Sequence, residues 1–286
     1  MELIKVSGNT YIFPGSTAIA IGVYLEDNEA TVIDTGIDEN NIKKIFNYLK
    51  DKGVSINSVI NTHCHADHIG GNAFLQKKGV KNFYSSEIES FFIKNTEFLP
   101  GYMFGSNPPT FMQNKFLMAE KTKNVNIKIP NIFNIIDLSG HSWQMIGILT
   151  KDDVLFCADS FYSEDIVLKH PMLFHIDTEN FLKKMDEILY MENYKKIISH
   201  GGVVNNIERT ININKNAIEN IINKILDSLP NYLDLIYSLL STDFKFNSSW
   251  EFYLNIVPFK SILSYLEKNG KIKFSIKEGK IYLDKI

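Results

Sequence analysis

Residues 61–71 read NTHCHADHIGG and hold three histidines and an aspartate within six positions, namely His63, His65, Asp67 and His68. The whole chain of 286 residues contains only seven histidines. The short apolar segment before the cluster, residues 54–61, predicts a strand, and the pattern after it predicts a helix that ends at Gly79. The cluster is therefore expected where a strand ends and a helix begins, which is where α/β proteins collect functional side chains.

The spacing of these side chains suits metal binding. Residues two apart in an extended segment point the same way, so His63 and His65 can bind one metal ion while Cys64 faces elsewhere. Asp67 and His68 fall at the start of the following helix and can reach a second ion beside the first. Imidazole combined with carboxylate suits zinc, with iron or manganese as alternatives.

Three later segments each supply one more candidate ligand. IIDLSGHSW places His141 after an apolar strand and a glycine turn, VLFCADSF ends a buried strand with Asp159, and KKIISHGG ends another with His200. Each residue stands at the end of a predicted strand, so the fold can bring it to the same sheet edge as the first cluster. Five of the seven histidines therefore belong to one predicted site.

Composition narrows the classes of partner. A net charge of −3 gives no general attraction to nucleic acid or anionic membranes. The first fifteen residues lack a basic region followed by an apolar run, so we expect a cytoplasmic enzyme without a signal peptide or a membrane partner. Cys64 and Cys157 are too few for a disulfide framework, which also fits a reducing compartment.

The order of patterns predicts an α/β core. Residues 2–6, 9–13, 17–26 and 30–34 are β-branched or aromatic runs and predict strands, while residues 38–53 predict an amphipathic helix. Strands and helices then alternate to about residue 200. Early strands followed by alternating units favour two sheets flanked by helices.

The pattern changes after residue 205. A long helical pattern over 206–229 ends at Pro230, two shorter ones follow over 231–240 and 257–270, and residues 271–286 alternate around a KEGK turn as a hairpin does. Helix, helix, helix, hairpin is the order of a winged-helix domain. We therefore expect a catalytic domain over 1–205 and a small α+β winged-helix-like domain over 206–286.

The ordered motifs VIDTG, THCHADHIGG, SGHS, CADS and SHGG resemble those of the metallo-β-lactamase-fold hydrolase superfamily. The resemblance implies a four-layer αβ/βα sandwich with the metals at one edge of the two sheets. It also implies two zinc ions in each chain. The first would be held by His63, His65 and His141, the second by Asp67, His68 and His200, and Asp159 would bridge both.

The same resemblance implies a mechanism. A hydroxide bridging two zinc ions would attack an ester, thioester, lactone or related bond of a small molecule, and Asp67 would steer the hydroxide or relay a proton. Asp34 in VIDTG matches the family's first motif and would orient a metal ligand. Its alternative role is that of a loop acid capping the next helix.

The substrate is less well defined by the sequence. Residues 91–120 are rich in Phe, Met and Pro and suit either a lid over the pocket or a helix pair packed on the core. His170 and His175 follow Asp159 closely; His175 is the candidate for a substrate contact, and a packing role is the alternative for each.

Two other functions remain open from the sequence. THCHADHI also resembles persulfide dioxygenases, which use a single iron. A third reading is a metal-dependent RNA-cleaving phosphodiesterase, since some relatives with a winged-helix-like domain cleave RNA. The candidate recognition helix over 257–270 carries only Lys260 and Lys268 beside Glu267, so nucleic acid is not the favoured partner. A homodimer contact is an alternative role for the C-terminal domain.

Overall fold

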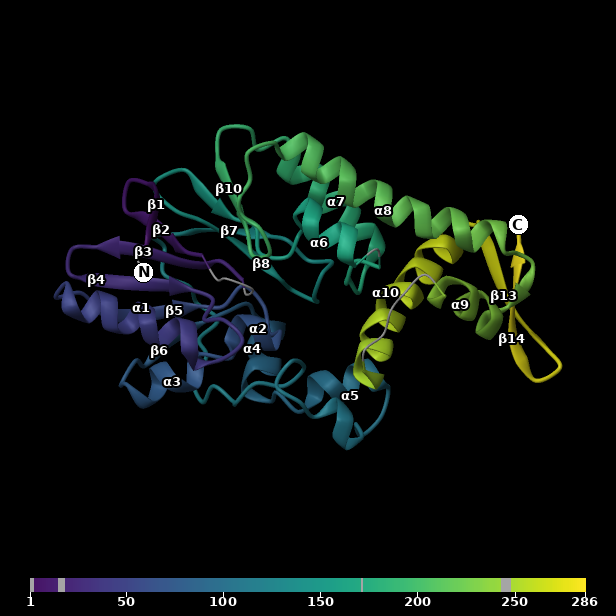
Figure 1. Ribbon diagram of the computed structural model, residues 1–286, viewed down its shortest axis with the longest axis horizontal. Helices are drawn as coiled ribbons and strands as arrows, with labels where there is room; N and C mark the ends of the chain where they lie inside the picture. Colours follow the sequence, from purple (N-terminus) through teal and green to yellow (C-terminus); the bar gives the residue numbers. More distant parts are fainter. Residues whose placement is uncertain (1–2, 15–18, 171, 243–247) are drawn as a thin grey trace.

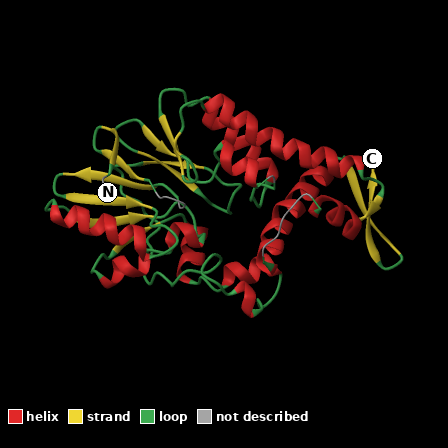
Figure 2. Cartoon of the chain, viewed as in Figure 1, coloured by secondary structure: helices red, strands yellow, loops and turns green. Residues whose placement is uncertain are grey.

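Two β-sheets lie face to face and helices cover their outer sides (Figure 1, Figure 2). The computed structural model describes residues 3–14, 19–170, 172–242 and 248–286. Residue 2 and residues 17–18, at the starts of two expected strands, lie outside this range. Within the described residues, none of the helices combines the length and apolarity that crossing a bilayer requires.

The first sheet is built from the N-terminal third of the chain. Its strands are β1 Ile4–Ser7, β2 Thr10–Phe13, β3 Ile21–Glu26, β4 Glu29–Ile33, β5 Ser55–Ile60 and β6 Asn82–Tyr84. They follow one another across the sheet in chain order. Neighbours from β1 to β4 are antiparallel, whereas β4, β5 and β6 are parallel. The carboxyl ends of β4 and β5 therefore meet at one edge of the sheet.

The second sheet comes from the middle of the chain. Its strands are β7 Asn134–Asp137, β8 Ile146–Leu149, β9 Val154–Phe156, β10 Lys195–Ile198 and β11 Gly202–Val203. They lie in the order β11-β10-β9-β8-β7, and β9 and β10 are parallel. The carboxyl ends of β9 and β10 thus also share one edge.

A buried apolar layer joins the two sheets. Ile33 and Ile60 of the first sheet pack with Ile148 and Phe156 of the second. Gly22 on β3 makes the close approach possible, since a Cβ there would lie 2.5 Å from the Phe156 ring. The contact fixes the two sheets relative to each other, so groups at their edges are held in register.

Helices complete the outer layers. Those that follow strands of the first sheet are α1 Glu39–Asp51, α2 Ala66–Ile69, α3 Asn72–Lys77 and α4 Glu87–Lys94. Those beside the second sheet are α6 Glu164–Lys169, α7 Thr178–Leu189 and the first half of α8 Ile207–Asp227. Ile42, Ile45 and Leu49 form the buried stripe of α1, as their spacing predicts. The four-layer αβ/βα arrangement expected from the sequence is thus the one observed.

The C-terminal part follows the expected order of elements with one addition. Helices α9 Leu233–Ser241 and α10 Ser249–Lys268 follow α8, and β13 Ile272–Lys277 and β14 Lys280–Lys285 form the hairpin. A short strand, β12 Asn231–Tyr232, pairs with β14 and was not predicted. The winged-helix assignment remains a prediction.

Helix α8 belongs to two cores. Ile211 and Ile218 pack with residues of α7 and β10, whereas Ile221 and Ile225 pack with α10 and the hairpin. Figure 1 shows the helix running from the second sheet out to the C-terminal elements. The domain boundary expected at residue 205 stays a prediction, and the first half of α8 packs with elements that precede this boundary.

The segment 91–120 forms helices that pack on the core and on α10. Its helices are the end of α4, α5 Phe98–Phe104 and a short 3-10 helix Thr110–Met112. Leu99, Met103 and Met112 are buried in the core beside the first sheet. Phe116 stacks on Trp250 of α10 with ring centroids 5.4 Å apart. The sequence left two roles open for this segment, a lid over the pocket or a helix pair packed on the core. The contacts that the structure describes are those of helices packed on the core.

The glycines at the end of the histidine stretch allow a close backbone contact. The expected single helix over 69–79 is two helices, α2 and α3, which meet at Gly70 and Gly71. A Cβ on Gly70 would lie 2.1 Å from the carbonyl oxygen of Ile37, in the loop after β4. Gly70 has ordinary helical angles, so the need is for space. This contact holds the turn that carries Asp67 and His68.

We predict that Gly70→Ala destabilises the protein by about 1–3 kcal/mol, because overpacking against backbone forces the loop to shift. The free energy of urea unfolding measures the loss. Gly101→Ala on α5 is the matched control, since its nearest neighbour is 3.3 Å away and Ala favours a helix over Gly by roughly 0.5–1 kcal/mol. Equal stability of Gly70→Ala and the unmodified protein would contradict the explanation.

Candidate metal centre

The candidate ligands gather where the parallel strands of both sheets end. Residues 61–68 follow β5, Asp159 follows β9 and His200 follows β10. His141 lies in the loop between β7 and β8. All seven residues proposed from the sequence as ligands lie in one cluster at the shared edge of the two sheets.

Three imidazoles form the first group. His65 Nδ1 lies 3.0 Å from His63 Nε2 and 2.8 Å from His141 Nε2. Tetrahedral zinc with ligands at 2.0–2.1 Å would separate its nitrogen ligands by roughly 3.3 Å. The three nitrogens are therefore close to the spacing that one shared ion imposes.

Asp67, His68 and His200 form the second group. His200 Nε2 lies 3.3 Å from Asp67 Oδ2, and His68 Nε2 lies 3.8 Å from the same oxygen. Asp159 stands between the two groups. Its Oδ1 is 3.4 Å from His68 Nε2, and its Oδ2 is 3.3 Å from His200 Nε2 and 3.6 Å from His141 Nε2.

The donor atoms fit divalent metal ions. Among the described residues, the buried atoms His68 Nε2 and Asp159 Oδ1 have no hydrogen-bond partner, which is costly for polar atoms unless another group compensates. The three nitrogens of the first group point at one another, and a single N–H can satisfy only one of those contacts. A cation bound in each group would be coordinated by these lone pairs and would compensate their burial.

The protonation states of the two groups differ. Burial lowers the pKa of His65 to about 4 and of His141 to about 3. Burial together with neighbouring imidazoles holds the pKa of His63 well below its usual range. These rings are therefore neutral near pH 7, as metal ligands must be.

The second group holds protons more tightly. Burial alone would lower the pKa values of both histidines, but the Asp34, Asp159 and Asp67 carboxylates raise the pKa of His68. Asp159 and Asp67 raise that of His200 to about 10. A metal ion bound by this group would displace those protons.

Asp34 orients His68 of the second group through the ring nitrogen that faces away from the cluster. His68 Nδ1 donates to Asp34 Oδ2 at 2.8 Å, while the backbone N–H and the hydroxyl of Thr62 donate to the same carboxylate. This bond leaves the lone pair of His68 Nε2 directed into the cluster. The alternative role for Asp34 is wrong, because Asp38 is the residue that caps α1.

His141 is supported by groups that the sequence did not indicate. Its Nδ1 donates to the carbonyl oxygen of Phe174 at 3.0 Å, and the Tyr162 hydroxyl donates to the same carbonyl at 3.1 Å. The Phe174 ring lies beside the rings of His65 and His141, with centroids 5.2 and 5.3 Å away. The carbonyl has no sequence signature, but Tyr162 stands three residues after Asp159 and could have been noticed.

His175, a candidate from the sequence, and Cys64 both lie outside the donor groups. His175 is buried, its Nδ1 donates to the Leu173 carbonyl and its Nε2 lies 2.9 Å from Thr178 Oγ1. These internal partners favour the packing role, and the substrate contact of His175 stays a prediction. Cys64 is buried in the core beside the first sheet and is no member of the donor groups, as the extended geometry predicts.

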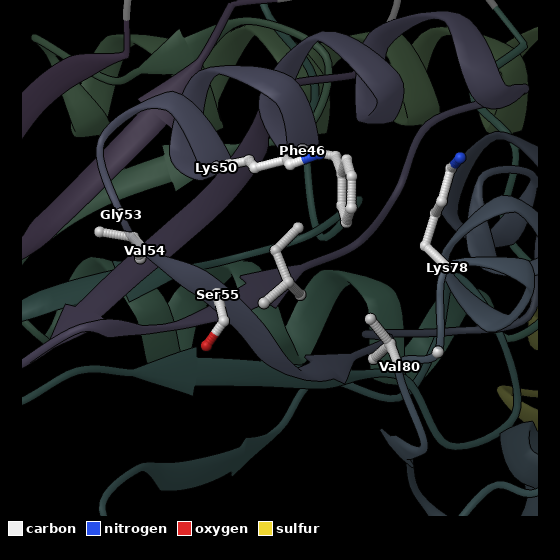
Figure 3. Close-up of a pocket in the computed structure, with 9 residues that line it drawn as sticks. Phe46, Lys50, Gly53, Val54, Ser55, Lys78 and Val80 are labelled. Atoms are coloured by element: carbon white, nitrogen blue, oxygen red, sulfur yellow. The ribbon is translucent and has the colours of Figure 1, made fainter.

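A cavity of about 400 Å³ lies elsewhere in the molecule (Figure 3). Phe46, Lys50 and Ser55 line it where α1 ends and β5 begins. The histidines follow the other end of β5, roughly 20 Å away for a strand of this length. This cavity is therefore separate from the metal centre.

Comparison with curated proteins finds hydrolases as relatives. The hydroxyacylglutathione hydrolase of Prochlorococcus marinus is 41% identical over 149 residues, which is 50% of this chain and 50% of that protein. Hydroxyacylglutathione hydrolase 1 of Vibrio vulnificus is 28% identical over 144 residues, or 50% of this chain and 47% of that protein. The matches thus span half or less of these relatives.

Solved structures share the fold over nearly the whole chain. A Beta-lactamase domain protein from Burkholderia ambifaria has a TM-score of 0.72 at 17% identity, covering 100% of this chain and 94% of that one. A metallo-beta-lactamase family protein from Thermus thermophilus has a TM-score of 0.70 at 13% identity, covering 97% and 99%. Residues 14–200 match the model of the Metallo-beta-lactamase superfamily, and the chain therefore belongs to that superfamily.

Proposed function

We propose that the protein is a metal-dependent hydrolase that cleaves a small thioester by means of two zinc ions. The observation that carries the proposal is the convergence of two donor groups on Asp159, one of three imidazoles and one of two imidazoles and a carboxylate. The thioester is favoured because the curated relatives are named hydroxyacylglutathione hydrolases. Esters and lactones have similarly reactive carbonyls and are the next candidates.

The assignment of ligands follows the two groups. His63, His65 and His141 would hold one ion, Asp67, His68 and His200 the other, and Asp159 would contact both. Bound there, two divalent ions would lower the pKa of a shared water from 15.7 toward about 7 and polarise the substrate carbonyl.

The protein contributes orientation. The Asp34 carboxylate and the Phe174 carbonyl accept the Nδ1 protons of His68 and His141, so both rings keep Nε2 free as a ligand atom. Fixing the tautomer in advance removes the cost of reorganising the rings when the ion binds.

Asp67 is the carboxylate of the centre most open to solvent, with a side-chain exposure of 31%. Burial opposes its ionisation, but His68 and His200 lower its pKa below the usual range, so it stays ionised near neutral pH. An ionised carboxylate at this place orients the attacking water by accepting a hydrogen bond. Of the two sequence-based roles for Asp67, steering the hydroxide therefore suits it better than relaying a proton.

The experiment that tests the function combines metal analysis with a substrate panel. Protein purified without added metal is analysed for zinc, iron and manganese, and assayed on a hydroxyacyl thioester of glutathione, on lactones and on phosphodiesters. We expect zinc close to two equivalents and the highest kcat/KM on the thioester. A single iron with oxygen uptake on glutathione persulfide would instead establish the dioxygenase reading, and cleavage of RNA alone would establish the phosphodiesterase.

We predict that Asp159→Ala removes zinc and lowers thioester hydrolysis by more than roughly 100-fold. Loss of a residue that only supports a ligand costs about 10–100-fold in metal affinity or activity, and loss of a shared ligand should cost more. Both donor groups lose a shared contact, while circular dichroism should show that the fold remains. His170→Ala is the control, because His170 is exposed and lies outside the donor groups. Turnover retained by Asp159→Ala would refute the bridging role.

We also predict that Asp34→Asn weakens zinc binding about 10–100-fold, the usual effect of losing the partner of a ligand histidine. An amide must place its NH₂ against either the Thr62 N–H or His68 Nδ1, both of which donate. Asp34 has φ +59°, a conformation that Asn also adopts, so the substitution should not strain the backbone. Competition with a chromophoric chelator measures the affinity.

Asp153→Asn is the matched control for this change. Asp153 also has φ +59° but is exposed in a turn before β9, away from the donor groups. Its zinc affinity should equal that of the unmodified protein. Similar affinities for the two variants would show that Asp34 does not act on the metal.

A further inference from the structure

One fully buried carboxylate near the metal centre has no part in the mechanism above. Glu89 lies in the first turn of α4 and has no exposed surface. Among the described residues, it forms no ion pair with a lysine, arginine or histidine. Burying an ionised carboxylate without a cation is costly, so its retention calls for strong hydrogen bonding or a nearby positive charge.

Three donors surround the Glu89 carboxylate. The backbone N–H of Cys64 donates to Oε2 at 3.0 Å. The Ser142 hydroxyl and the backbone N–H of Gln144 donate to Oε1 at 2.7 and 2.8 Å. Hydrogen bonds to a charged acceptor are about twice as strong as neutral ones, so these bonds fix both segments firmly.

The donors come from the two loops that carry the first donor group. Cys64 stands between His63 and His65, and Ser142 directly follows His141. These loops are far apart in the chain, because one follows β5 of the first sheet and the other precedes β8 of the second. Glu89 is thus a clamp between the sheets, one oxygen on each ligand loop.

Charge gives a second reason for an acid at this place. Asp34, Asp67, Asp159 and Glu89 are the carboxylates of the cluster and its supports, and two divalent ions bound there would bring four positive charges close to them. The five imidazole ligands add none when they bind metal as neutral rings. The positive charge of bound ions would therefore favour an acidic side chain at the Glu89 position.

We infer that Glu89 is a positioning residue for the metal centre, which holds the His63–His65 loop and the His141 loop at the spacing that the first ion requires. The inference rests on the proposed metal-dependent function. It adds a residue that none of the five sequence motifs contains. Glu89 itself contributes no ligand atom to either donor group.

The test compares Glu89→Gln with the unmodified protein by zinc competition against a chromophoric chelator and by the visible absorption of the cobalt-substituted protein. An amide has only one accepting oxygen, so its NH₂ must face the N–H of Cys64 or of Gln144. We expect zinc affinity to fall about 10–100-fold. The cobalt absorption bands should also shift, because the ligand geometry changes.

Two further variants separate positioning from simple support of the fold. Ser142→Ala removes one donor and keeps the acid, so it should weaken zinc binding less than Glu89→Gln. Ser90→Ala changes a buried neighbour on α4 whose hydroxyl donates to the Glu87 carbonyl, and it should leave affinity and spectrum unchanged. If Glu89→Gln does not fold, Ser142→Ala and its cobalt spectrum carry the test.

The outcomes distinguish this inference from the proposed function. If the unmodified protein binds no metal, the proposed function fails. If it binds zinc and Glu89→Gln binds it with the same affinity and spectrum, only the inference about Glu89 fails, even where the variant's melting temperature falls. An equal loss in Ser90→Ala would assign the effect to the stability of α4.

Discussion

The structure depends on the burial of many polar donor atoms at one edge of two packed sheets. His63, His68 and Asp159 have at most 4% of their surface exposed, and the lone pairs of these groups cannot all be satisfied by the protein's own hydrogens. Such a cluster is stable only where a cation compensates it and the surrounding backbone prevents its collapse. The rigid contact between the sheets and the close approach at Gly70 provide that restraint.

The gathering of the seven candidate ligands could be predicted from the sequence, because each candidate follows a strand and a strand's end fixes where the next side chain lies. The sequence did not predict the supports. Glu89 is one of two acids in the first turn of α4, and acids are common at that position in any helix. The Phe174 carbonyl belongs to the backbone, so no residue type in the sequence indicates it. Both act across 25 residues or more, a separation at which only the folded chain shows the contact.

The C-terminal part shows a different limit of sequence reasoning. The pattern placed the start of the last helix at Val257, but α10 begins at Ser249 and continues through Pro258. Residues 250–257 are half-buried on all sides, since Trp250, Tyr253 and Leu254 pack toward the first-sheet core while Phe252 and Ile256 pack toward the C-terminal core. A helix between two cores lacks the single apolar stripe on which helix prediction relies.

That double packing makes the C-terminal part continuous with the metal centre. The Thr178 backbone N–H donates to Ser261 Oγ of α10, and the Thr178 hydroxyl lies 2.9 Å from the ring of His175. Phe174, which directly precedes His175, supplies the carbonyl that accepts the hydrogen bond from His141 Nδ1. A chain of bonded groups thus leads from α10 to His141, one of the candidate metal ligands. A shared fold does not decide the substrate, so the residues that select one are to be sought in elements such as α10 and segment 91–120, which pack on each other and on the first-sheet core.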